Sequence, residues 1–246
     1  MKIKIAITDS RIGTEAERRL TLLGYRVITL LSFSRLSEAV ASHPDMLIRK
    51  IGNEYISYAD YCEEASYVFS DLSVLSVGTG ARFCFSADEV KPEYPHDVGL
   101  NALLMGDILF CRVASASPLM LELARREGLR VVDVKQGYPA CTVLKLSESA
   151  AITADQGLAK ILEKNGIRVT LITPGSIFLP PHEYGFIGGA GEAHDGKLFL
   201  FGDVNTHPDK DKIISAASSE GLSVISLSGG ILRDLGGIIF TEGNID

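Results

Sequence analysis

Polar and apolar residues recur along this chain in one order: a helical segment, a glycine, and then a short β-rich run. The pattern occurs at residues 14–28, 118–132, 155–170 and 208–225, with Gly24, Gly128, Gly166 and Gly221 at the junctions. Glycine suits the position after a helix because it enters the left-handed backbone region without a Cβ clash. A fifth copy lacks the glycine and predicts a helix at residues 59–70 and a strand at residues 72–77.

Two β-rich runs separated by a short turn precede each helix after the first. These pairs lie within residues 46–58, 98–113, 141–153 and 184–201, with turns such as Gly52-Asn53-Glu54 and Met105-Gly106-Asp107. Turn residues of this kind favour hairpins. The repeating unit is therefore predicted to be strand–strand–helix–strand, or ββαβ.

The first helix is preceded by a single predicted strand, residues 3–8. Residues 236–240 can supply the strand that this unit lacks, so that the end of the chain closes the first unit and removes exposed sheet edges. We therefore predict an α/β fold, a closed five-unit ββαβ ring, with residues 1–246 as a single domain. The alternative is an open sheet of βαβ units, but simple βαβ crossovers do not need a hairpin before each helix.

Composition and charge restrict the expected partners. The chain is 46% hydrophobic and 22% charged, as globular domains are. Its apolar runs are shorter than the ~18 residues of a membrane span, and its first residues lack the apolar segment of a signal peptide. Its net charge of −7 disfavours a nucleic-acid partner. We expect a cytoplasmic protein with no membrane partner, and the sequence leaves open whether it forms a homo-oligomer.

The four cysteines, at positions 62, 84, 111 and 141, are too far apart for CxxC zinc or redox motifs. We therefore expect reduced thiols and neither a metal nor another cofactor. Two His-Pro-Asp segments, residues 43–45 and 207–209, could each offer two metal ligands, but two ligands do not make a site. The glycine-rich residues 185–191 do not have the spacing of a nucleotide-binding loop. Gly188 and Gly189 are instead expected to let strands crowd together at the ring axis.

Several motifs are similar to those of one known fold family. They lie at residues 136–141 (QGYPAC), 152–155 (ITAD), 185–190 (GFIGGA), 207–209 (HPD) and 232–237 (LRDLGG). Together with the five-unit ring, they make the chain resemble a bacterial family of unknown function with the pentein, or guanidino-group-modifying enzyme (GME), fold. This resemblance implies that its relatives include deiminases, amidinotransferases, dimethylarginine hydrolases and non-catalytic proteins that bind the ribosome.

The chain departs from the catalytic members of that fold in one respect. Those members carry a cysteine in the closing C-terminal segment, whereas residues 233–240 contain none and no cysteine follows Cys141. Whether this protein is an enzyme therefore stays open.

In such a ring, the segments that enter the first strand of each unit converge on the centre. These segments and the ITAD motif supply the expected ligand-binding residues: Asp45, Tyr94, Asp97, Tyr138, Asp155 and Asp234. Carboxylates gathered in one pocket would bind a guanidinium or an amine. The alternative is that these are ordinary turns, which use proline and aspartate for backbone reasons. Asp155, like Asp9, Asp60 and Asp203, also stands where a carboxylate caps a helix.

Cys141 is the candidate nucleophile because it is expected to open a strand with its thiol toward the central channel. A neighbouring histidine, for which His96 is the candidate, would lower the pKa of the thiol and act as its base. The alternative is that Cys141 is a small buried core residue.

Two functional hypotheses follow. In the first, the protein binds a small cationic ligand with a guanidino, amidino or amino group in a central polar channel. In the second, it is a cysteine-dependent hydrolase or transferase acting on guanidino, amidine or amide groups, with Cys141 as nucleophile.

Overall fold

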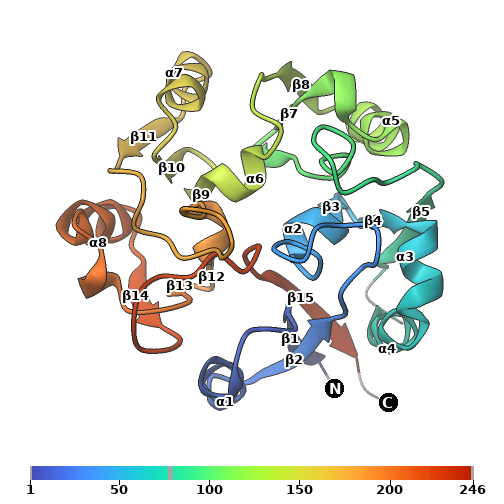
Figure 1. Ribbon diagram of the computed structural model, residues 1–246, viewed down its shortest axis with the longest axis horizontal. Helices are drawn as coiled ribbons and strands as arrows, with labels where there is room; N and C mark the ends of the chain where they lie inside the picture. The colour runs from blue at the N-terminus through green and yellow to red at the C-terminus, as the bar shows by residue number, and fades with distance from the viewer. Residues whose placement is uncertain (1, 77–79, 245–246) are drawn as a thin grey trace.

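The computed structural model describes residues 2–76 and 80–244, which form five three-stranded sheets arranged around a central axis (Figure 1). In each sheet the middle strand pairs antiparallel with one neighbour and parallel with the other. The main helices lie toward the outside of the ring (Figure 1). The predicted ββαβ unit is therefore confirmed in all five places.

The units follow one another around the ring. Unit one contains β15 (Ile239–Asn244), β1 (Lys2–Asp9), α1 (Thr14–Leu22) and β2 (Tyr25–Leu30). Unit two contains α2 (Pro44–Leu47), β3 (Arg49–Ile51), β4 (Glu54–Tyr58), α3 (Ala59–Glu64), α4 (Ser66–Ser76) and β5 (Arg82–Ser86). Unit three contains β6 (Leu103–Met105), β7 (Ile108–Cys111), η1 (Val113–Ser115), α5 (Pro118–Arg126) and β8 (Arg130–Asp133).

The last two units have the same order of elements. Unit four contains α6 (Pro139–Thr142), β9 (Val143–Ser147), β10 (Ala150–Thr153), α7 (Gln156–Lys164) and β11 (Arg168–Leu171). Unit five contains η2 (Gly188–Ala190), β12 (Gly191–His194), β13 (Lys197–Leu200), η3 (Val204–Thr206), α8 (Lys210–Ser219) and β14 (Ser223–Ser226).

The C-terminal strand closes the first unit, as the sequence predicts. β15 pairs antiparallel with β1, from Lys2 opposite Asn244 to Ile7 opposite Ile239. Unit two also holds this strand, because the Tyr55 hydroxyl donates a hydrogen bond to Thr241 Oγ1 at 2.6 Å. The paired strand begins at residue 239 rather than at the expected residue 236.

The structure confirms that a glycine follows each of the four helices in which the sequence predicts one. Gly24, Gly128, Gly166 and Gly221 follow α1, α5, α7 and α8 with φ between 70° and 89°, where a side chain would be strained. Asp155 caps α7 as expected, accepting bonds from the N–H groups of Gly157 and Leu158. Asp203 accepts a bond from Asn205 N in the same way at η3.

The two remaining expected caps are wrong. Asp9 is buried and bonded to the side chain of Arg11, several residues before α1 begins. Asp60 lies inside α3, where its carboxylate pairs with Arg35 at 2.7 Å.

Apolar clusters hold neighbouring units together. Leu20 of α1 packs in one cluster with Phe199 and Phe201 of unit five, while Leu162 of α7 packs in another with Phe110 of unit three. Each cluster draws residues from more than one unit, so the hydrophobic stabilisation depends on the ring being assembled.

Three expected strand positions are wrong. Residues 72–76 continue the helix α4, with Val68 and Leu72 buried on one side, and β5 begins only at Arg82; residue 77 lies outside the described residues. Residues 184–190 form a loop and η2, so the first strand of unit five is β12. Cys141 lies in α6 rather than at the start of a strand. Periodicity misplaces short apolar segments of this kind because it cannot separate helix from strand over so few residues.

None of the helices in the described part of the chain is long and apolar enough to cross a membrane.

We propose that the chain folds as one unit because β15 supplies the last edge of the ring. Deleting residues 239–246 should abolish cooperative thermal unfolding, since β1 loses its hydrogen-bonded neighbour and exposes an edge. Circular dichroism and size-exclusion chromatography would measure this, with deletion of residues 245–246 alone as the control. A longer truncation that stays monomeric and melts at the same temperature would contradict the proposal.

Candidate functional site

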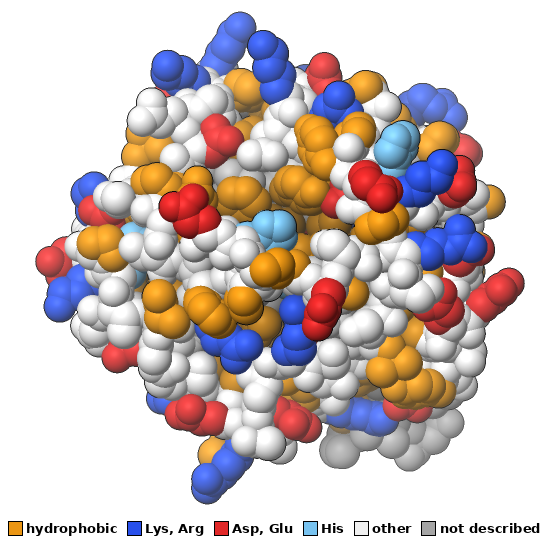
Figure 2. Space-filling view, in the orientation of Figure 1, with side chains coloured by type: hydrophobic (Ala, Val, Ile, Leu, Met, Phe, Trp, Pro, Cys, Tyr) orange, Lys and Arg blue, Asp and Glu red, His pale blue; other side chains and the backbone are white. Residues whose placement is uncertain are grey.

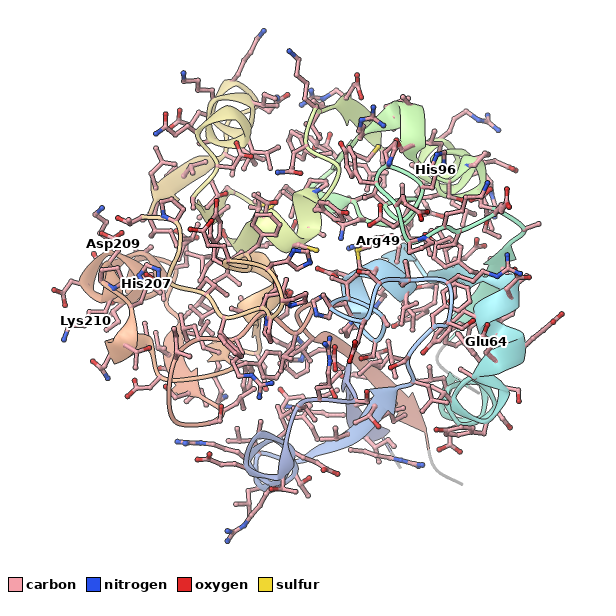
Figure 3. The ribbon with its side chains drawn as sticks, viewed as in Figure 1. Arg49, Glu64, His96, His207, Asp209 and Lys210 are labelled. Carbon is pink, nitrogen blue, oxygen red and sulfur yellow. The ribbon has the colours of Figure 1, made fainter. Side chains whose placement is uncertain are left out.

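The first strands of the five units surround a cavity of about 320 Å³ at the ring axis, the axial cavity. Its lining includes residues of β3, β6, β9 and β15 and Glu192 of β12. The charged side chains among them are Asp45, Arg49, Lys50, Lys145 and Glu192. Figure 3 labels Arg49 beside the middle of the ring. The ring therefore places both signs of charge in one central space.

A group of titratable side chains lies where the chain enters these strands. It consists of Asp9, His43, Asp45, Cys141 and Asp234, which we call the axial cluster. Asp9 ends β1, His43 and Asp45 begin α2, Cys141 lies in α6, and Asp234 precedes β15. All five are buried, so residues as far apart in the chain as Asp9 and Asp234 share a site that excludes most water.

Glycines make this convergence possible. A Cβ atom on Gly188 would overlap the backbone oxygens of Ala140 and Cys141, and one on Gly189 would overlap the Asp234 carboxylate. These two glycines therefore allow a close approach at the axis, as expected, but the elements that they bring together are η2, α6 and the Asp234 segment rather than two strands.

His43 is enclosed by three carboxylates. Its Nε2 lies 3.7 Å from Asp9 Oδ2, and its Nδ1 lies 3.8 Å from Asp234 Oδ1 and 4.0 Å from Asp45 Oδ1. Neither ring nitrogen has a hydrogen-bond partner among the described residues. Burial lowers the pKa of His43, and the nearby Asp234 and Asp9 act in the opposite direction.

The three carboxylates of the axial cluster differ in their surroundings. Burial disfavours the charge of Asp9, but hydrogen bonds from Arg11 hold its pKa below the ordinary value. Burial raises the pKa of Asp234 to about 6, and its oxygens accept bonds from Phe186 N at 2.8 Å and Gly236 N at 3.2 Å.

Asp45 is the carboxylate without compensation. Neither of its oxygens has a hydrogen-bond partner of good geometry among the described residues. Burial raises the pKa of Asp45 to about 6, although the Cys141 thiol and Arg49 act in the opposite direction. Asp45 is 7% exposed and is one of the residues that line the axial cavity, although both of its carboxylate oxygens are buried.

Cys141 is not an activated thiol in this structure. Burial raises its pKa well above the ordinary value, and the nearby Asp45 and Asp234 raise it further. Asn101 Nδ2 donates a hydrogen bond to Cys141 Sγ at 3.0 Å, while Asn101 Oδ1 accepts one from Ala140 N. The buried Asn101 therefore fixes the start of α6 and the position of the thiol.

The structure does not bring the expected partners Cys141 and His96 together. His96 is exposed and lines a different cavity of about 460 Å³ with Arg112, and Figure 3 labels it near α5, away from the axis. The histidine of the axial cluster is instead His43, because the His-Pro-Asp segment turns inward at α2.

The remaining expected ligand residues lie beside the axial cluster or apart from it. The Tyr138 hydroxyl donates to Asp97 Oδ2 at 2.5 Å, and the Tyr138 and Tyr94 rings are 5.8 Å apart. Burial raises the pKa of Tyr138, and Asp97, Cys141 and Tyr94 add to that effect, which places this tyrosine near the thiol. Asp155 lines a third cavity, of about 350 Å³, with Tyr184.

The second His-Pro-Asp segment is structural. His207 Nδ1 accepts a hydrogen bond from Asp209 N at 3.0 Å, and Asp209 Oδ2 accepts one from Thr173 N at 2.6 Å; Figure 3 labels both beside α8. Within residues 2–76 and 80–244, no group of three or more His, Cys, Asp or Glu side chains could hold a metal ion.

The outer surface in Figure 2 has no comparable concentration of one charge. Acidic and basic side chains are interspersed over this face, and apolar side chains lie around its middle. The carboxylates of the axial cluster therefore have no counterpart on this face.

Comparison with sequence families identifies the chain's relatives. The model of a family of unknown function, DUF6873, matches residues 7–239. The chain belongs to this family. No curated protein matches it.

Solved structures of similar shape show the same fold at low sequence identity. One is a dimethylarginine dimethylaminohydrolase in an adduct with S-methyl-L-thiocitrulline, at 12% identity and a TM-score of 0.55, covering 92% of this chain and 93% of that one. DDAH from Pseudomonas aeruginosa in complex with citrulline matches at 10% and 0.54, covering 91% of each chain. SxtG, an amidinotransferase from Microseira wollei in the saxitoxin biosynthetic pathway, matches at 15% and 0.52, covering 88% and 76%. The ring therefore has the pentein, or GME, fold.

Sequence analysis missed five residues of this region as parts of the site: Asp9, His43, Arg49, Asn101 and Glu192. Asp9 was expected to be a helix cap, and the His-Pro-Asp segment of His43 suggested metal ligands. The other three lie in or beside short strands, where a polar residue looks like an outward-facing position until the ring places it at the axis.

The buried charge of Asp45 should make stability depend on pH. Between about pH 4 and pH 6 the native state holds the proton of Asp45 more tightly than the unfolded chain, so the free energy of unfolding falls as pH rises. A shift of about 2 units corresponds to about 3 kcal/mol. Asp45→Asn should therefore be more stable than wild type at pH 8, by up to that amount, and nearly equal to it at pH 4.

Urea unfolding at both pH values would measure the difference. Asp155→Ala is the control, because it removes a helix cap and should destabilise the protein at pH 8 by about 1 kcal/mol. An Asp45→Asn variant that is less stable than wild type at pH 8 would show that Asp45 has a compensating partner.

Proposed function

We propose that this protein binds a small cation, a guanidino, amidino or amino compound, in its axial cavity, with Asp45 as the group that receives it. The observation that carries the proposal is a buried carboxylate beside a cavity whose oxygens have no hydrogen-bond partner of good geometry and are compensated only by the Cys141 thiol and the nearby Arg49. Such a group is costly to bury unless a partner compensates it. A guanidinium can supply two parallel N–H donors to both carboxylate oxygens.

The charge of the axial cluster supports a cationic ligand. Asp9, Asp45 and Asp234 together carry three negative charges when ionised; Arg11 pairs with Asp9, and the cations Arg49, Lys50 and Lys145 line the cavity beside Asp45. A bound cation would favour the ionised forms of Asp45 and Asp234, whose pKa values burial raises to about 6. Of the compounds named in the DDAH structures, S-methyl-L-thiocitrulline carries an amidino-type group of the kind proposed here, whereas the ureido group of citrulline is uncharged.

Ligand binding should stabilise the folded protein by mass action, by about 2.7 kcal/mol at a hundredfold excess over Kd. For a chain of this size that corresponds to a rise in Tm of roughly 5–10 °C. We expect arginine, agmatine or a related compound to produce this rise in wild type but not in Asp45→Asn. Differential scanning fluorimetry would measure it.

This test has one control variant and one outcome that would contradict it. Asp155→Ala should keep the full ligand-induced rise, because Asp155 lines a separate cavity. Stabilisation of wild type by anions or nucleotides alone would contradict a cationic ligand.

A second candidate function is cysteine-dependent hydrolysis of the same ligand, and it rests on the position of Cys141 beside Asp45. In this reaction Cys141 Sγ bonds to the amidine carbon, the C–N bond breaks, and the amine leaves with a proton. Water then breaks the C–S bond and restores the thiol. A bound cation would favour the thiolate because it offsets Asp45 and Asp234, which raise the pKa of Cys141. His43 is the histidine available in the cluster to carry the proton.

The electrostatic part of this candidate can be tested on the free protein. We expect Cys141 to react slowly with iodoacetamide at pH 8, and Asp45→Asn to accelerate it several-fold because one of the nearby negative charges is gone. Mass spectrometry of the labelled peptides would measure both rates. Cys111, whose pKa burial raises to about 11, lies near Asp133 and should be unaffected by Asp45→Asn.

Unchanged labelling of Cys141 in Asp45→Asn would remove the electrostatic basis for thiol activation.

A further inference from the structure

The groups that the proposed function uses are enclosed in this structure. Both carboxylate oxygens of Asp45 are buried, and Cys141 and Asp234 are buried residues. A ligand therefore reaches them only after a covering segment moves away. The segment that moves at the lowest cost is the one that buries the fewest apolar side chains.

The long connection between β11 and η2 contains such a segment, residues 178–186, which we call the strap. Figure 1 shows this connection reaching the middle of the ring. Ile177 and Ile187, on either side of the strap, are buried in one apolar cluster with residues of units four and five, so its two ends are held. Within the strap two residues are buried, and residues 180–184 are all exposed.

The helical turns beside the axial cluster are anchored more firmly than the strap. Met46 and Leu47 of α2 and Cys141 of α6 are all buried in one large apolar cluster. The strap adds to that cluster only the half-buried Phe186. Moving α2 or α6 would disrupt the core, whereas moving the strap would expose little apolar surface.

Asp234 of the axial cluster holds the strap in place. Its backbone N–H donates to Phe178 O at 3.0 Å, and its Oδ2 accepts a hydrogen bond from Phe186 N at 2.8 Å. Leu232 O accepts a further bond from Phe178 N at 2.8 Å. A Cβ atom on Gly185 would lie 2.6 Å from Asp234 Cβ, so the strap rests directly on this aspartate. One residue of the cluster thus binds both ends of the strap.

The space behind the strap extends to the thiol side of the cluster. The cavity of about 350 Å³ that Asp155 lines is bounded by Tyr184, Gly185 and Phe186 of the strap. Thr142, the residue after Cys141, lines the same cavity. Moving the strap outward would therefore open this cavity to solvent and uncover the Asp234 carboxylate.

We propose that the strap is a gate to the axial cluster and that the Asp234 carboxylate is its latch. This inference rests on the proposed function and adds the route by which the ligand enters. Opening breaks the bond from Phe186 N and leaves the Asp234 carboxylate accessible to a cation. A hydrogen bond to an ionised carboxylate is stronger than one to a neutral acceptor, so the charge of Asp234 favours the closed state.

Hydrogen–deuterium exchange of the folded protein at pH 7.5, measured by mass spectrometry, tests the gate. In wild type, strap peptides should exchange at least tenfold faster than peptides from β13, because the strap opens without global unfolding. In Asp234→Asn the strap should exchange about tenfold faster again, since asparagine has one acceptor oxygen for the N–H groups of Phe186 and Gly236. Asp209→Asn is the matched control, because Asp209 accepts a bond from Thr173 N, before the strap, and its loss should leave strap exchange unchanged.

Alkylation of Cys141 gives a second readout that separates opening from charge. Asp45→Asn and Asp234→Asn each remove a negative charge near this thiol, but only Asp234→Asn releases the strap. Asp45→Asn should therefore speed alkylation without changing strap exchange, whereas Asp234→Asn should speed both. Equal strap exchange in the two folded variants would overturn the latch.

The wild-type measurements need no variant, so they decide the question even where Asp234→Asn fails to fold. Strap peptides that exchange as slowly as β13 would overturn the gate. Saturating agmatine should slow strap exchange, because a ligand held behind the closed strap stabilises the closed state. Agmatine that raises Tm without slowing strap exchange would overturn the gate and leave the proposed cation site intact. A strap that opens as expected in a protein that binds no guanidino or amino compound would overturn the proposed function and leave the gate to Cys141 supported.

Discussion

Pairing of the last strand with the first is the constraint on which the rest of this structure depends. β15 has no partner near it in the sequence, and it gains one only when β1 receives it at the opposite end of the chain. That pairing brings the unit-one segment containing Asp234 to the axis, where it meets α2 and α6. Without closure, Asp45 and Cys141 would lie in an open groove filled with water. Burial, which raises their pKa values, would then be lost.

Closure concentrates charged side chains of both signs at the centre of the ring. The five inner strands start from the same end of the axis, so the polar residues that precede them meet in a small volume. Glycine at positions 188 and 189 allows the backbone to approach closely enough for this to happen. Of the three carboxylates, Asp9 is compensated by Arg11 and Asp234 by backbone N–H groups, while Asp45 has no comparable donor.

The thiol and the cavity are linked through this one carboxylate. Asp45 raises the pKa of Cys141, and Arg49 favours ionisation of Asp45. A ligand that changes the charge near Asp45 therefore changes the thiol as well. Binding and thiol chemistry are two consequences of the same electrostatic arrangement, although the cysteine stands in unit four and the closing segment of the fold carries none.

The sequence by itself determined the ββαβ unit, its five-fold repetition and the closing strand, because glycines after helices, turn residues and apolar runs act locally. It also pointed to Asp45, Asp234 and Cys141 as parts of one site. Only the tertiary structure decided that His43, not His96, joins them, and that Arg49 and Glu192 line the cavity. A side chain's neighbours across a ring depend on how five units pack, and no spacing within one segment records that geometry.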